Sequence, residues 1–107
     1  MKHTKPLYIG LTTEFYDAFA DGSKTIEYRK ESDPRYTRAK CPIGRPVRIE
    51  VRQHVTRWRP TLYGTVVGYR VTSKLTKAFK RVYPGYRGRM VCVEIKKSGG
   101  NVINLTP

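Results

Sequence analysis

Three segments typical of strands constrain this chain more than any other feature, and apolar and polar residues alternate in the first and the last of them. They cover residues 47–52, 62–72 and 90–96. Alternation with a period of two is typical of strands that bury one face against a core. The middle segment is interrupted by Gly64 and Gly68, and glycines inside a strand often mark bulges or sharp bends. These segments predict a curved sheet with one buried face.

Shorter segments predict three more strands. Residues 7–11 form an apolar run that suits a buried strand. Residues 25–29 alternate in character, and residues 101–106 follow two glycines as a last short strand. With the three longer segments, this gives about six strands, an ordinary number for a small sheet.

Two short helices are predicted between the strands. The first begins after Thr12–Thr13, which can cap it, and ends at Gly22. The second is capped by Ser73 and ends at the turn formed by residues 83–86. The residues predicted to face the core are Phe15, Ala18 and Phe19 in the first helix, and Leu75, Ala78, Phe79 and Val82 in the second.

The order of these elements predicts one α+β domain over residues 1–107. Strands mostly follow one another, so we expect a small β-barrel of about five or six strands with two flanking helices. A chain of 107 residues allows one compact domain. Residues 30–46 form a long polar connection with three prolines, and connections of this length are usually functional or mobile.

Several classes of protein are excluded by simple patterns. The chain has no run of about 20 apolar residues, so we expect no contact with a membrane through a spanning segment. The first residues lack a signal-peptide core, and Cys41 and Cys92 have no C-x-x-C spacing, which together predict a reduced, cytoplasmic protein. His3 and His54 have no metal-ligand spacing. We therefore expect neither a metal nor another cofactor.

The charge of the chain is large and unevenly distributed. Lys and Arg number 22 against 8 Asp and Glu, for a formal net charge of +14. Residues 1–53 carry 11 basic and 7 acidic residues, and residues 54–107 carry 11 basic residues and a single acid, Glu94. A field of this size attracts polyanions, above all nucleic acid. The alternatives are a highly solvated surface and a basic face that binds an acidic protein.

One short segment, residues 22–29, concentrates functional side chains. Glu27 and Arg29 are two residues apart on a predicted strand, so both project from the same face. Lys24 lies where that strand begins. A carboxylate and a guanidinium in this arrangement can form a hydrogen-bonded unit. Spacing alone favours an ordinary exposed ion pair beside a solvated lysine.

Gly22, Lys24, Glu27 and Arg29 resemble the G-x-K-x-x-E-x-R motif of the ASCH domain, a member of the PUA-like superfamily. The resemblance extends over roughly residues 6–97, because residues 82–95 are similar to the last helix, turn and strand of small proteins of this family. It implies a PUA-like β-barrel with a cleft that the motif lines. It also implies contacts with RNA or another nucleic acid, or with a nucleotide or modified nucleoside.

The resemblance also implies two enzymatic alternatives. Some small proteins of the family hydrolyse the acyl group from cytidine acylated on its exocyclic amine, and others cleave RNA. Lys24 matches the motif lysine of the amidohydrolases, whereas the position of their threonine is Glu27 here, and no acid occurs from residue 51 to residue 93 at the place of their distant glutamate. The catalytic candidates are Lys24, which would stabilise negative charge, and Glu27, which would act as a base.

Basic and aromatic residues occur together in two stretches of the second half. Aromatic rings can stack on unpaired bases while arginines hold phosphates, and stacking contributes ~1–3 kcal/mol per base. For the tyrosines the alternative is ordinary packing, whereas Trp58 between two arginines is expected to be exposed. The residues predicted to bind nucleic acid are Lys24, Arg29, Arg52, Arg57, Trp58, Arg59, Lys77, Tyr86, Arg87 and Arg89. The sequence thus predicts binding of single-stranded or structured RNA, with a small hydrolase as the alternative.

Overall fold

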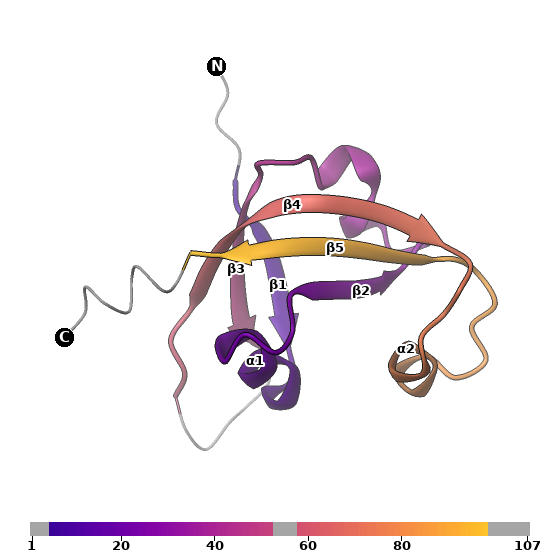
Figure 1. The fold of residues 1–107 in the computed structure, drawn as a ribbon, viewed down its shortest axis with the longest axis horizontal. Coiled ribbons are helices and arrows are strands. Elements are labelled where there is room, and N and C mark those ends of the chain that lie inside the picture. Colours follow the sequence, from indigo (N-terminus) through magenta and orange to yellow (C-terminus); the bar gives the residue numbers. More distant parts are fainter. Residues whose placement is uncertain (1–4, 53–57, 99–107) are drawn as a thin grey trace.

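A computed structural model describes residues 5–52 and 58–98 of the chain. The elements are β1 (Leu7–Leu11), α1 (Thr13–Ala20), β2 (Ile26–Lys30), β3 (Pro46–Val51), β4 (Leu62–Thr72), α2 (Lys77–Val82) and β5 (Met90–Lys97). The predicted α+β class is confirmed, with two helices beside a curled, half-barrel sheet (Figure 1). The predicted strand at 101–106 lies outside the described residues.

The described strands form one sheet in the order β1-β3-β4-β5-β2. Strand β1 pairs with β3 in parallel, and the other neighbours are antiparallel. The register between β4 and β5 shifts between Val66 and Gly68, which confirms the predicted irregularity at that glycine. At Gly64 a Cβ atom would lie 2.7 Å from the carbonyl oxygen of Lys96, so only glycine lets the two strands approach this closely.

The alternating segments bury the faces that the pattern predicts. Val47 and Ile49 of β3, Val66 of β4 and Val91 and Val93 of β5 are almost fully buried in one core. On α1 the buried face is shifted by one residue from the prediction. Its buried residues are Tyr16 and Phe19, whereas Phe15 and Ala18 are only partly buried.

Helix α2 begins later than predicted, and Ser73 is not its cap. The hydroxyl of Thr76 accepts a hydrogen bond from the amide of Phe79 at 3.1 Å, which makes Thr76 the N-cap. Of the predicted apolar face, Phe79 is buried, while Ala78 is exposed and 48% of Val82 is accessible. A six-residue helix can anchor only one large side chain here, so its remaining apolar surface stays open on the side that faces α1.

The long connection at 30–46 packs against the sheet. Two short 3₁₀ helices, Pro34–Tyr36 and Arg38–Lys40, shape it. Tyr36 and Cys41 are buried, and the Tyr69 hydroxyl donates to the carbonyl oxygen of Tyr36 at 2.7 Å. Through Tyr36, whose ring centre lies 4.7 Å from the guanidinium carbon of Arg29, the connection contacts β2. In the described part of the chain, no helix has the length and apolar character needed to cross a membrane.

Candidate functional site

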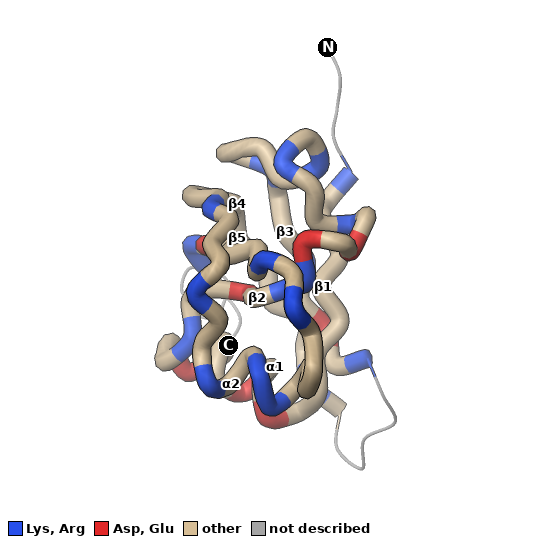
Figure 2. The backbone as a smooth tube through the Cα atoms, turned by 90° about the vertical axis from the view of Figure 1, so that its right-hand side faces the viewer, with Lys and Arg blue, Asp and Glu red and all other residues tan. Residues whose placement is uncertain are grey.

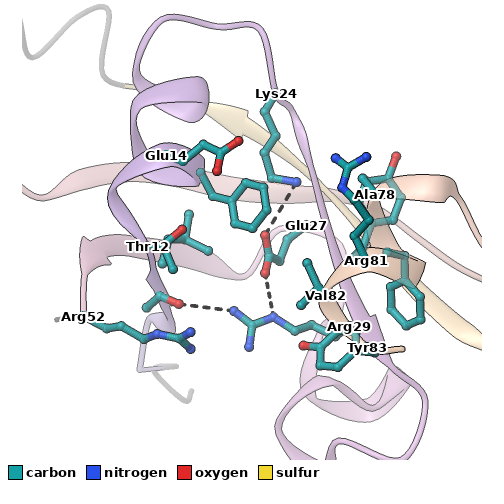
Figure 3. Close-up of a pocket in the computed structure, with 15 residues that line it drawn as sticks. Thr12, Glu14, Lys24, Glu27, Arg29, Arg52, Ala78, Arg81, Val82 and Tyr83 are labelled. Atoms are coloured by element: carbon teal, nitrogen blue, oxygen red, sulfur yellow. Dashed lines mark hydrogen bonds and ion pairs between the residues drawn. The ribbon is translucent and has the colours of Figure 1, made fainter. Parts of the chain in front are cut away.

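The motif residues lie where α1 turns back into β2. The chain leaves α1 through Gly22, whose φ of +87° belongs to the left-handed region that favours glycine. The backbone amide of Lys24 then donates to the carbonyl oxygen of Ala18 at 3.0 Å, which fixes the turn. This turn directs the side chain of Lys24 back over α1, toward the space between α1 and α2 (Figure 3).

Glu27 and Arg29 form a buried ion pair, so the interpretation as an exposed pair is wrong. Each residue is only 5% exposed. Arg29 Nε donates to Glu27 Oε2 at 2.6 Å, and the guanidinium carbon lies 4.7 Å from the centre of the Tyr36 ring. Spacing could not show this, because the burial comes from the curl of the sheet and from residues distant in sequence.

The pair also connects the two edges of the sheet. Strands β1 and β2 are the edge strands of the described sheet, and Arg29 Nη2 donates to the carbonyl oxygen of Gly10 in β1 at 3.4 Å. A side chain on one edge therefore reaches the backbone of the other edge. The Glu27–Arg29 pair thus closes the half-barrel on its open side, and it forms the floor of the site.

Lys24 is held among aromatic rings and is not the solvated lysine that spacing suggests. Its ammonium lies 4.9 Å from the ring centre of Tyr28, 5.3 Å from that of Phe15 and 5.5 Å from that of Phe19. Nζ is 3.9 Å from Glu27 Oε1, and the lysine side chain is 18% exposed. Burial lowers the pKa of Lys24 below its usual range, although the charge of Glu27 acts in the opposite direction.

One carboxylate oxygen of Glu27 remains available. Oε2 is bound to Arg29, whereas Oε1 is 3.9 Å from the Lys24 ammonium, too far for a hydrogen bond. Among the described residues no hydrogen bond to Oε1 is found, and the close-up places this carboxylate between Lys24 and Arg29 (Figure 3). Burial raises the pKa of Glu27, and the Arg29 and Lys24 charges oppose that rise. A ligand N–H group that enters the pocket could donate a hydrogen bond to this oxygen.

These side chains lie at the floor of a pocket between α1, β2 and α2 with a volume of about 420 Å³. This volume is within the range of small-molecule sites. The apolar and aromatic walls comprise Gly10, Leu11, Phe15, Tyr28, Ala78, Phe79, Val82 and Tyr83. The polar lining comprises Thr12, Glu14, Lys24, Glu27, Arg29, Arg52 and Arg81. Four cationic side chains thus face two carboxylates, so the pocket is both apolar and basic.

Several lining residues were not predicted from the sequence. Glu14 supplies a second carboxylate from the first turn of α1, whereas the resemblance places a second acid within residues 51–93, which hold none. Arg81 follows Ala78 by three residues, so both lie on one helix face, and this spacing could have identified it. Tyr28, the strand residue between Glu27 and Arg29, also lines the pocket, and no sequence signal predicted that.

The structure brings together four of the predicted site residues and separates the others. Lys24, Glu27, Arg29 and Arg52 line the pocket, whereas none of the remaining predicted residues in the described part of the chain does so. Trp58 is 79% exposed, which confirms the predicted exposure. Arg57 lies outside the described residues.

The predicted residues outside the pocket form two groups. Arg59 Nε donates to Asp17 Oδ1 of α1 at 2.9 Å. Lys77, Arg87 and Arg89 are exposed around α2 and the turn before β5, and Arg89 pairs with Glu31. Tyr86 is half-buried and its hydroxyl donates to the carbonyl oxygen of Arg89 at 2.8 Å. Because Lys30 lies 5.0 Å from the ring centre of Tyr83, a pocket residue, and 5.6 Å from that of Tyr86, this second group adjoins the pocket.

The described residues offer no metal site, and no matching family model or curated protein suggests a role for the pocket. In the ranges 5–52 and 58–98, no group of three or more His, Cys, Asp and Glu side chains is placed to hold a metal ion. Both cysteines are buried free thiols. Comparison with protein-family models and with curated proteins gives no match for this chain.

Proposed function

We propose that the chain is a nucleic-acid-binding domain of the ASCH type, with a PUA-like barrel, that holds one unpaired base of single-stranded or structured RNA in its pocket. The observation that carries the proposal is the floor of the pocket, where the free Glu27 Oε1 lies 3.9 Å from the Lys24 ammonium. An acceptor and a donor thus lie side by side. Base edges present hydrogen-bond donors and acceptors side by side, and unpaired bases are read on those edges.

The walls of the pocket support the same ligand class. Phe15, Tyr28 and Tyr83 supply aromatic surface, and Val82 and Ala78 supply aliphatic surface that no protein side chain fully covers. A base inserted here would exchange water for these walls, and stacking on an aromatic ring contributes ~1–3 kcal/mol. Simple anions lack the flat apolar faces that such walls favour.

The charge of the whole chain supports a polyanionic partner. The net charge is +14, and Lys and Arg far outnumber Asp and Glu over the described backbone (Figure 2). An apolar pocket in a neutral protein would suit a free metabolite equally well. Here the field would concentrate phosphate chains around the opening, which favours nucleic acid over a free base.

Fluorescence anisotropy with a labelled single-stranded RNA and the matching duplex tests the proposal. We expect the single strand to bind more tightly than the duplex, since a paired base cannot enter the pocket. Lys24→Met should weaken single-strand binding at least tenfold, as loss of a charge-assisted hydrogen bond and one cation predicts. Lys40→Met, the same change at an exposed site outside the pocket, is the control. Equal binding of both RNA forms, unaffected by Lys24→Met, would contradict the proposal.

A second candidate function, hydrolysis of RNA or of acylated cytidine, is favoured by one observation. The pKa of Lys24 is lowered by burial, and a lysine must lose its proton to act as a base or nucleophile. Glu14 adds a second carboxylate at the pocket for an acid–base pair. Chromatography of N4-acetylcytidine and of RNA incubated with the protein would show the products. Turnover that Lys24→Met abolishes while the fold is retained would make the chain an enzyme.

The proposed setting is the reduced cytoplasm. Cys41 and Cys92 are both buried and unpaired, and burial raises the pKa of each thiol, which keeps both in the unreactive protonated form. Neither cysteine lines the pocket. The proposed chemistry therefore uses no thiol.

A further inference from the structure

Two arginines stand at the rim of the pocket on opposite sides. Arg52 directly follows β3, beside the wall that β1 and α1 form, and Arg81 belongs to α2. Both are exposed, whereas Arg29 at the floor is buried. In the close-up, the two guanidinium groups lie on either side of the floor formed by Lys24, Glu27 and Arg29 (Figure 3).

These arginines differ from the other cations of the pocket in their partners. The charges of Lys24 and Arg29 face Glu27, at 3.9 Å and 2.6 Å. Among the described residues, neither Arg52 nor Arg81 forms an ion pair, although several other arginines of the chain do. A planar guanidinium fork without a carboxylate partner matches the oxygens of a phosphate group.

We propose that Arg52 and Arg81 bind the two phosphates on either side of the inserted nucleotide, so that the ligand is an internal nucleotide of a strand. This inference rests on the proposed function. A base that enters the pocket leaves its sugar at the opening, with one phosphate on the 5′ side and one on the 3′ side. The floor can satisfy the base, and the two rim arginines then face two separate phosphates. A free nucleoside would use only the floor, and a nucleoside monophosphate would use one arginine.

Nucleoside ligands with defined phosphates test this arrangement. The four ribonucleoside 3′,5′-bisphosphates, the corresponding 5′- and 3′-monophosphates and the nucleosides would each be titrated into ¹⁵N-labelled protein, with the amides of Gly10 and Val82 as pocket reporters. For the base that binds most tightly, we expect each phosphate to strengthen binding roughly fivefold, as for an exposed ion pair. The bisphosphate should therefore bind more tightly than either monophosphate.

Three variants distinguish a clamp from general attraction. Arg52→Gln should remove the gain from one phosphate and Arg81→Gln the gain from the other, so that each variant binds the bisphosphate no better than one of the two monophosphates. Arg70→Gln makes the same change at an exposed position of β4 that does not line the pocket, and it should lower the affinity for all phosphate ligands only slightly and equally. A bisphosphate that binds no better than the better monophosphate would overturn the inference, as would equal effects of all three variants.

The two proposals fail in distinguishable ways. If single-stranded RNA binds in a manner that depends on Lys24, but the bisphosphate shows no advantage, the phosphate clamp is wrong and the base pocket stands. If neither the RNA nor any nucleoside ligand shifts the resonances of Gly10 and Val82, both proposals are wrong.

Discussion

The buried pair of Glu27 and Arg29 is the residue-level feature on which both the fold and the site depend. Arg29 binds Glu27 at 2.6 Å and also reaches the Gly10 carbonyl oxygen of the opposite sheet edge at 3.4 Å. Two charges removed from water are favourable only while each has its partner. The pair therefore stabilises the closed side of the sheet and at the same time holds Glu27 Oε1 at the pocket floor.

Removing one partner should destabilise the protein strongly. We expect Glu27→Gln to lower the free energy of unfolding by about 3–5 kcal/mol, because Arg29 would stay buried without a compensating charge. The double variant Glu27→Gln/Arg29→Met should lose clearly less than the sum of the two single variants. Urea denaturation measures all three. Arg48→Gln, which removes the exposed pair with Glu50, is the control and should cost at most about 1 kcal/mol.

Additive losses in the double variant would show that the two side chains do not stabilise each other. A loss for Glu27→Gln as small as that of the control would show that the pair is exposed in solution.

Lys24 should titrate below the ordinary range of a lysine. Burial among aromatic rings lowers its pKa from the usual value of 10.5, so its side-chain ¹³Cε resonance should titrate below that pH. The folded state then releases this proton before the unfolded state does. The contribution of Lys24 to the free energy of unfolding should therefore rise as pH increases from the folded pKa toward 10.5.

Comparison of wild type with Lys24→Met isolates this contribution, since both share every other titrating group. A difference in stability that stays constant across that alkaline range would contradict the lowered pKa.

At the scale of elements, helix α2 lines the pocket with side chains that remain exposed. It is anchored by Phe79, which packs near Met90 and Cys92 and lies 4.9 Å from Tyr83 between ring centres. Its other apolar residues face the pocket. Because Phe79 is the one buried side chain of α2, the rest of the helix surface remains accessible to a ligand.

The start of α2 can be tested directly. Thr76→Ala should lower the stability by about 1 kcal/mol, because the amide of Phe79 would lose its side-chain acceptor. Ser73→Ala should have almost no effect, since Ser73 precedes the helix by several residues. Thermal denaturation of the two variants provides the measurement. A larger loss for Ser73→Ala than for Thr76→Ala would place the cap where the sequence alone predicted it.

The elements themselves were largely predictable, and the site was predictable only in part. Period-two alternation identified β3 and β5, and the long segment with two glycines identified β4; all three strands bury side chains in one core. The motif spacing located Lys24, Glu27 and Arg29. Their burial was not predictable, since it depends on β1 and on the 30–46 connection, which only the curl of the sheet brings to the site. The exposed side chains of α2 were not predictable either, because they depend on which of its residues pack against the core.

At the scale of the whole molecule, the net positive charge is the feature that the proposed function uses to attract a nucleic acid. The formal net charge of the chain is +14. Among the described residues, only Glu14 and Glu27 bring acidic side chains to the pocket. Under the proposed function, long-range attraction would bring a phosphate chain to the protein, and the pocket would select the unpaired base. Trp58 and the basic group around α2 remain predicted contacts along the strand.

Binding of single-stranded RNA should weaken steeply with salt. Each phosphate that the protein neutralises should contribute about −0.7 to the slope of log affinity against log salt. Arg87→Gln should make the slope shallower by about that amount if the turn before β5 belongs to the binding surface, as predicted. Anisotropy titrations from about 50 to about 200 mM salt cover the range in which this effect is large. An affinity that does not change with salt would exclude a phosphate-binding surface.

The central claim is that an unpaired base enters the pocket, and intermolecular NOEs test it most directly. The complex of the ¹³C,¹⁵N-labelled protein with an unlabelled, unstructured RNA would be studied by isotope-filtered NMR. We predict NOEs from RNA base protons to the Val82 methyl groups and to the Tyr28 ring, both of which line the pocket. NOEs confined to residues outside the pocket, such as Trp58 or the exposed Tyr63 and Val67 of β4, would contradict the account.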